Sequence, residues 1–198
     1  MPTISDISRR QALKGSLVLP LIAGMDAPAA TLPAVGAEPS ASGSKTLVAY
    51  FTRTGNTRLI ATQIARAKGA SLFQIFPANP YPEDYEEQVA QATDERNRNY
   101  EPAMREDVPA FSSYETVFLG FPIWGTSAPS IIRSFLSRHD MSGKTLVPFI
   151  THGGFGLGSS LAVVTEHAPG ADILEAFSKQ CDQERETLTE VTQWLETT

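Results

Sequence analysis

The sequence predicts an α/β fold built on a parallel sheet, and two observations support this. Short apolar segments typical of buried strands alternate with longer segments whose apolar residues recur at helical spacing, and from residue 45 the alternation occurs five times. Neighbouring parallel strands need long right-handed crossovers, which the helical segments supply. We therefore expect a doubly wound parallel sheet of five strands with helices on both faces.

The first half of this region is expected to hold two strands and two helices. Residues 45–51 are almost continuously apolar, as in a buried strand, and residues 57–68 have a helical pattern that ends at Gly69. Residues 70–76 alternate apolar and polar side chains, which is typical of a strand nearer an edge. After a proline-rich loop, residues 84–99 contain good helix formers without glycine or proline.

The second half repeats the pattern three times. The first of its strands is continuously apolar, which is typical of a central strand. The next contains Pro148, whose missing N–H requires a bulge or an unpaired position. The strands are expected at residues 115–121, 144–151 and 171–177, and the helices at residues 128–138, 156–167 and 183–196.

The composition indicates a globular chain and disfavours several classes of partner and site. The 198 residues are 41% hydrophobic and carry a net charge of −6, without clustered Lys and Arg, so a nucleic acid is not expected as a partner. No apolar run reaches the roughly 18 residues that a transmembrane helix requires. The three histidines lack metal-ligand spacing and Cys181 is the single cysteine, so neither a metal site nor an internal disulfide is expected.

The N-terminus resembles a twin-arginine export signal. Arg9 and Arg10 precede a short apolar stretch at residues 15–24 and an Ala-x-Ala motif at residues 27–29. A disordered basic tail is the alternative. Export would place the mature protein in the periplasm or outside the cell. This route moves proteins after they fold, which suits one that must bind a cofactor before it leaves the cytoplasm. A signal, a flexible linker and a folded domain are thus expected at residues 1–29, 30–44 and 45–198.

The loop after the first strand is dense in small and polar residues: Thr52, Arg53, Thr54, Gly55, Asn56 and Thr57. Open parallel sheets bind ligands beyond the carboxyl ends of their strands. The N-terminus of the following helix exposes unpaired N–H groups and a partial positive charge, and the hydroxyl and amide side chains add donors. A phosphate would fit here without a lysine. The alternative is that these residues only cap the helix.

Two further loops are expected at the same edge of the sheet. One would present an aromatic side chain either to a flat ligand ring or to the core, and it contains Pro122, Ile123, Trp124 and Gly125. The other exposes backbone N–H groups that suit the polar edge of a planar ligand, and it contains Thr151, His152, Gly153, Gly154, Phe155 and Gly156. Phe155 would cover a ring, whereas His152 is either structural or functional.

Together the three loops resemble the flavodoxin family. The motifs are TRTGNT, GFPIWGTSAP and THGGFGLG, with PYPEDY after the second strand, and the likeness spans roughly residues 45–197. The resemblance implies a strand order of 2-1-3-4-5 and FMN as cofactor. It assigns Thr52 and residues 54–57 to the phosphate loop, and residues 122–125 and 151–156 to the loops that flank the ring. In the family the backbone near flavin N5 changes its hydrogen bonding with redox state, a role that Gly125 matches.

The same loops predict the kind of redox function. Low-potential flavodoxins surround the flavin with acidic side chains, whereas the second and third loops contain no Asp or Glu, so a low potential is not expected. The leading hypothesis is an exported FMN protein that passes electrons to a redox partner protein or a small acceptor. The first alternative is an NAD(P)H-dependent quinone or nitro-group reductase with a second substrate near Tyr81, His152 and Phe155. A flavin-binding module without turnover is the second alternative.

Overall fold

A computed structural model of the chain describes residues 43–154, 156–180 and 184–198. All the strand pairs within these ranges are parallel, and the strands follow the order β2-β1-β3-β4-β5, with β6 also paired to β4. The predicted fold class and strand order are therefore confirmed. The strands are β1 (Thr46–Tyr50), β2 (Ser71–Gln74), β3 (Thr116–Pro122), β4 (Thr145–His152), β5 (Asp172–Ile173) and β6 (Phe177–Gln180).

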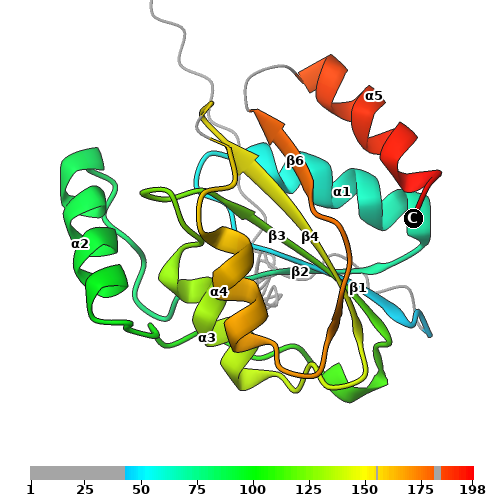
Figure 1. Cartoon of the computed structure of the whole chain (residues 1–198), viewed down its shortest axis with the longest axis horizontal. Helices are drawn as coiled ribbons and strands as arrows, with labels where there is room; N and C mark the ends of the chain where they lie inside the picture. The colour runs from blue at the N-terminus through cyan, green and yellow to red at the C-terminus, as the bar shows by residue number, and fades with distance from the viewer. Residues whose placement is uncertain (1–42, 155, 181–183) are drawn as a thin grey trace, which may run out of the picture. The chain divides into compact units, whose positions relative to one another are not determined.

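Helices cover both faces of the sheet. Figure 1 shows α1 and α5 beside one face and α3 and α4 over the other. Leu47 and Ala49 of β1 are buried against the α3 and α4 face, whereas Val48 and Tyr50 are buried against the α1 and α5 face. Because both faces are buried, β1 and β3 read as continuous apolar runs. The helices are α1 (Asn56–Lys68), α2 (Tyr85–Asn97), α3 (Ser130–Arg138), α4 (Ser160–His167) and α5 (Glu184–Leu195), with a short 3-10 helix, η1, at Phe111–Ser113.

The last predicted strand, at residues 171–177, is broken in two, and Pro148 explains why. Asp172 N–H donates to the Lys144 carbonyl and Leu174 N–H to the Leu146 carbonyl, so alternate residues of β4, Pro148 among them, face β5 and β6. Pro148 has no N–H to donate on that side. The pairing stops there and resumes at Phe149 with Phe177. The predicted unpaired position at Pro148 is thus confirmed, whereas the prediction of one continuous fifth strand was wrong.

The fourth helix begins later than its pattern predicted. We expected it at residue 156, but α4 begins at Ser160. Gly156 and Gly158 have φ angles of +69° and +52°, which are incompatible with a right-handed helix. The glycine loop therefore extends to Ser159. The other predicted elements match within a few residues at each end.

The described ranges contain no helix that is long and apolar enough to cross a membrane. The predicted export signal and most of the predicted linker lie outside the described residues.

Candidate functional site

The loop between β1 and α1 holds an uncapped helix N-terminus. Gly55 precedes α1 with a φ of +97°, and in the described part of the chain no side chain caps the helix. The Thr52 hydroxyl instead accepts a hydrogen bond from Gly55 N–H within the loop, at 3.0 Å. The alternative that these residues only cap the helix is therefore not what the structure shows. The first turn of α1 contains no acidic side chain, so its partial positive charge has no local counter-charge.

Thr57 has a different environment from the other threonines of this loop. Its side chain is buried, and its hydroxyl lies 2.9 Å from that of Thr151, at the end of β4. This hydrogen bond joins the first turn of α1 to the third predicted loop. Thr54, by contrast, is exposed.

The loop after β3 forms a tight turn. Trp124 and Ser127 exchange backbone hydrogen bonds of 2.9 and 3.2 Å, and the residues between them, Gly125 and Thr126, have φ angles of +54° and +67°. Two consecutive positive φ angles are typical of a type I′ turn and are unfavourable for a β-branched residue such as Thr126. The turn therefore holds the Trp124 backbone in a fixed position next to the cavity described below.

The loop after β4 packs against this turn. The Thr126 carbonyl accepts hydrogen bonds from Ser159 N–H at 2.9 Å and from the Ser159 hydroxyl at 3.3 Å. A Cβ atom built on Gly158 would overlap the Thr126 carbonyl group, with its carbon only 2.7 Å away. A glycine is therefore required at position 158 by this close approach as well as by its positive φ.

A cavity of about 360 Å³, which we call the loop cavity, lies where these loops meet. Such a volume is typical of sites for small organic ligands. Most of the predicted site residues line it: Thr52, Arg53, Thr54, Asn56, Thr57, Pro122, Ile123, Trp124, Gly125, Thr151 and Gly153. Of the predicted residues that the structure describes, Gly55, His152, Gly154 and Gly156 do not line it. Phe155 lies outside the described residues.

His152 has a local structural contact instead. Its Nδ1 accepts a hydrogen bond from Gly154 N–H at 3.1 Å, which shapes the glycine loop. The imidazole ring therefore stabilises the backbone conformation of its own loop. It lines neither the loop cavity nor the second cavity described below.

Helix α2 supplies a wall of the loop cavity that sequence reasoning missed. Its lining residues are Tyr85, Gln88, Val89, Ala92, Thr93 and Arg96. Tyr85, Val89 and Ala92 have helical spacing and are typical of a core stripe, but the structure leaves Tyr85 67% and Val89 44% exposed. The buried residues of α2 are the polar Gln88 and Glu95. The helix therefore buries polar side chains and exposes apolar ones beside the cavity, an arrangement that its sequence alone does not reveal.

The Gln88 side chain suits a ligand in this cavity. It is only 4% exposed, and its amide oxygen has no hydrogen-bond partner among the described residues. Buried polar atoms are nearly always paired in native proteins, so an unpaired one that lines a cavity indicates a missing donor. A ligand with N–H or O–H groups would supply that donor.

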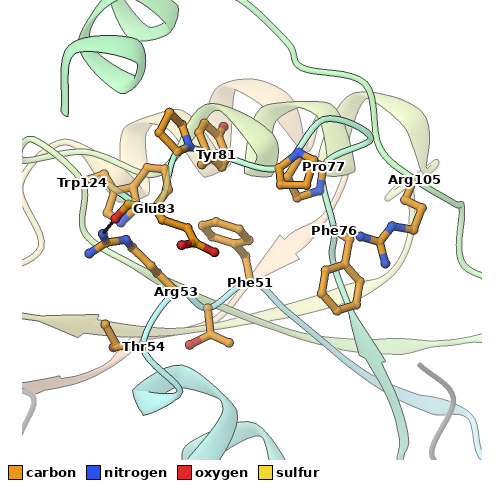
Figure 2. A pocket seen from close by; sticks show the side chains of 12 residues that line it. Phe51, Arg53, Thr54, Phe76, Pro77, Tyr81, Glu83, Arg105 and Trp124 are labelled. Carbon is orange, nitrogen blue, oxygen red and sulfur yellow. Dashed lines mark hydrogen bonds between the residues drawn. The ribbon is translucent and has the colours of Figure 1, made fainter. Parts of the chain in front are cut away.

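Figure 2 shows the lining of a second cavity of about 370 Å³, which we call the proline cavity. It shares Thr52, Arg53, Thr54 and Trp124 with the loop cavity. Its remaining lining residues are mostly aromatic side chains and prolines: Phe51, Phe76, Pro77, Pro80, Tyr81, Pro82, Glu83 and Arg105. The Trp124 ring contacts Phe51 and Tyr81 edge to face, with centroids 5.2 and 4.8 Å away. Trp124 is thus part of the wall between the two cavities.

Tyr81 is held as a neutral phenol. Its hydroxyl donates to the Glu95 carboxylate at 2.9 Å. Burial, and after it the negative charge of Glu95, raise the pKa of Tyr81 well above its usual value. Tyr81 is therefore an aromatic wall and a hydrogen-bond donor, and it does not lose its proton at neutral pH.

The comparisons with known proteins agree with this geometry. A family model described as flavodoxin matches residues 45–198, which is most of the chain. The chain belongs to the flavodoxin family. The resemblance to flavodoxins that the three loop motifs indicated is therefore confirmed. A comparison with curated proteins gave no match.

Solved structures of other flavodoxin-like proteins resemble this family member. A candidate flavoprotein from Bacteroides eggerthii DSM 20697 is 33% identical over 77% of this chain and 96% of its own, with a TM-score of 0.66. Another from Bacteroides uniformis ATCC 8492 is 30% identical over 78% and 99%, with a TM-score of 0.68. A Lactobacillus acidophilus NCFM flavoprotein, solved in complex with FMN, is 19% identical over 73% and 97%, with a TM-score of 0.59, and shows the shared fold.

Proposed function

We propose that the chain binds FMN in the loop cavity and exchanges electrons through it with a redox partner protein or a small acceptor. One observation carries this proposal: a single cavity joins an uncapped, hydroxyl-rich helix N-terminus to an aromatic wall. When bound, FMN supplies the electron-accepting ring, and the protein binds, orients and shields it. Membership of the flavodoxin family supports FMN as the cofactor.

The hydroxyl-rich end of the cavity suits the 5′-phosphate of FMN. The N-terminus of α1 presents backbone N–H groups and partial positive charge to this end. Thr52, Thr54 and Asn56 add side-chain donors there. Gly55, with its positive φ, lets the backbone turn tightly around the anion, although it has no side chain in the cavity wall.

The other end of the cavity suits the isoalloxazine ring. Trp124 and Ile123 provide a flat apolar surface after β3, and Gly153 lines the cavity after β4 without a side chain to obstruct a ring. Stacking on an aromatic side chain contributes on the order of 1 kcal/mol beyond the burial of area. From α2, the Gln88 amide would hydrogen-bond the polar groups of the ligand.

The proline cavity favours a second function on the same fold, an NAD(P)H-dependent quinone or nitro-group reductase. It adjoins the loop cavity at Trp124 and is lined largely by aromatic rings and prolines, as a site for a second planar compound would be (Figure 2). Tyr81 lines it, whereas His152 does not. A flavin-binding module without turnover is the remaining alternative.

The purified full-length protein tests these functions directly. We expect it to carry FMN or to take up added FMN, to be reduced by dithionite without losing the cofactor, and to pass electrons to an added acceptor such as ferricyanide. Rapid anaerobic bleaching by NADPH would favour the reductase. If no added acceptor reoxidises the reduced cofactor, only the flavin-binding module without turnover remains. Failure to take up FMN would contradict all three functions.

We also propose that the protein is exported by the twin-arginine route. The paired Arg9 and Arg10 and the stretch that follows them support this. Replacing both arginines with lysine should retain the protein in the cytoplasm, whereas the unaltered chain should appear in the periplasm or medium. Equal distribution of the two proteins would contradict the proposal.

A further inference from the structure

We propose that Arg96 of α2 raises the reduction potential of bound FMN by stabilising the negative charge that the ring gains on reduction. This inference rests on the proposed function, because it requires FMN in the loop cavity. Arg96 belongs to no motif of the three loops, and only its position in the folded chain points to this role.

Arg96 reaches the ring end of the cavity. It lines the loop cavity from α2, and its guanidinium group lies directly against Gly125. A Cβ atom built on Gly125 would overlap this group, with the Cζ atom only 3.0 Å away. Gly125 follows Trp124, the residue that supplies the aromatic surface. The guanidinium charge therefore lies next to the part of the cavity that suits a ring.

The charge of Arg96 is not neutralised by its neighbours. Its side chain is partly buried, and its guanidinium has no hydrogen-bond or ion-pair partner among the residues that the structure describes. The two acidic residues before it are engaged elsewhere. Asp94 pairs with Arg98 at 3.1 Å. Glu95 accepts hydrogen bonds from Tyr81 at 2.9 Å and from Gln91 at 2.8 Å. The guanidinium is therefore available to an anionic group of a ligand in the cavity.

The charged lining of the loop cavity is entirely positive. Of the described residues, Arg53 and Arg96 are its charged members, and no Asp or Glu lines it. Arg53 lies in the phosphate loop and donates to the Glu83 backbone carbonyl at 3.0 Å. Arg96 is thus the positively charged side chain at the ring end of the loop cavity. This lining is the opposite of the acidic surroundings that disfavour a reduced, anionic flavin.

The sign of the effect follows from the charge balance of the reaction. Reduction adds two electrons from the partner and one proton from solvent, so the ring gains one negative charge. A nearby fixed positive charge favours the more negative state, since charges interact strongly in a cavity from which water is partly excluded. Arg96 should therefore increase the affinity for reduced FMN more than that for oxidised FMN, which raises the potential. Weaker reductants than those that reduce low-potential flavodoxins would then reduce this protein.

A role for Arg96 in binding the phosphate makes a different prediction. The phosphate of FMN has the same charge in both redox states. A residue that binds only the phosphate therefore changes the affinity for oxidised and reduced FMN equally and leaves the potential unchanged. The midpoint potential of the bound cofactor distinguishes the two roles.

The test is an anaerobic redox titration of the FMN-loaded full-length protein and its Arg96→Gln and Arg96→Lys variants. Arg98→Gln is the matched control, because Arg98 directly follows the same helix but is exposed and paired with Asp94. We expect Arg96→Gln to lower the affinity for reduced FMN at least about tenfold relative to oxidised FMN, a drop of about 30 mV in a two-electron potential. Arg96→Lys should retain most of the potential, and Arg98→Gln should leave it unchanged.

Two outcomes would overturn the inference. The first is an Arg96→Gln protein that binds FMN with an unaltered potential, which includes an equal loss of affinity for both redox states, the result expected of a phosphate ligand. The second is an equal shift of the potential in Arg98→Gln. Failure of the unaltered protein to bind FMN is a separate result, since it would contradict the proposed function itself.

Discussion

The hydroxyl oxygens of Thr57 and Thr151 lie 2.9 Å apart, and both side chains are buried. The two residues are far apart in sequence, at the first turn of α1 and near the end of β4. Their hydrogen bond holds together two of the three loops that form the loop cavity. Thr57 is therefore part of the framework of the site, in addition to lining the cavity.

Replacing Thr57 with valine should destabilise the fold. Thr57→Val keeps the shape of the side chain but leaves the Thr151 hydroxyl buried without a partner, which costs about 1–3 kcal/mol. The double variant Thr57→Val/Thr151→Val should lose less than the sum of the two single losses, because neither hydroxyl is then left unpaired. Urea unfolding measures all three free energies. Simple additivity would mean that the two hydroxyls do not interact in solution.

Replacing Thr54 with valine should affect the ligand and not the fold. Thr54 is exposed and lines both cavities, so its loss should change the free energy of unfolding by less than about 0.5 kcal/mol. If it donates to the phosphate, Thr54→Val should weaken FMN by roughly tenfold or more and leave riboflavin, which has no phosphate, unaffected. Thr62→Val, on α1 outside both cavities, is the control. An equal loss of affinity for FMN and riboflavin would argue against a phosphate at this position.

Replacing Gly158 with alanine should separate the two loops that flank the predicted ring site. The new methyl group would overlap the Thr126 carbonyl, and the φ of +52° adds strain. Gly156→Ala is the matched control, because Gly156 also has a positive φ, +69°, but no atom of the described, non-adjacent residues lies within 4 Å of its Cβ position. Thermal unfolding should show Gly158→Ala to be less stable than Gly156→Ala by about 1–3 kcal/mol. Equal stabilities would mean that the contact with Thr126 is loose.

The stability of the protein should fall as the pH decreases below about 6.5, in part because of His139. Its Nε2 accepts a hydrogen bond from Val108 N–H at 3.1 Å, and its Nδ1 lies 2.8 Å from the Phe135 carbonyl, so the neutral ring fits both contacts. Burial lowers the pKa of His139 in the folded state. The folded state therefore binds fewer protons than the unfolded chain in this range, and acid favours unfolding.

The matched variant for this pH effect is His139→Gln. The nearby charges of Asp107 and Arg138 pair with each other at 2.7 Å, and the Arg138 guanidinium lowers the pKa of Asp107 further from this pH range. The free energy of unfolding, measured in urea between about pH 7 and 5, should decrease more for the unaltered protein than for His139→Gln. Parallel pH profiles would show that His139 does not carry the effect.

The fold was largely predictable because its signals are local. Buried parallel strands appear in the sequence as apolar runs, and the helices between them have apolar residues at helical spacing. The order of elements could therefore be derived from the sequence alone. The strand order came from the resemblance of the three loops to the flavodoxin family. The break between β5 and β6 was not predictable, because it depends on which neighbour the missing N–H of Pro148 faces. The delayed start of α4 follows from the positive φ angles of Gly156 and Gly158, which depend on how the loops pack.

The site was predicted in part for the same reason. The loop residues follow strands directly, so the parallel topology brings their positions to one edge, and the structure groups most of them around one cavity. The contribution of α2 depends on where this helix packs, which its sequence does not specify. Its apolar residues Tyr85, Val89 and Ala92 fit a core stripe equally well. Arg96 had no motif to mark it.

The measurement that tests the account most directly is a titration of the apo form of the full-length protein with FMN and, separately, with riboflavin, followed by quenching of flavin fluorescence. We expect one FMN per chain and an affinity for FMN at least about tenfold higher than that for riboflavin, because the N-terminus of α1 and the threonine hydroxyls bind the phosphate. Equal affinities, or no saturable binding of either flavin, would contradict it.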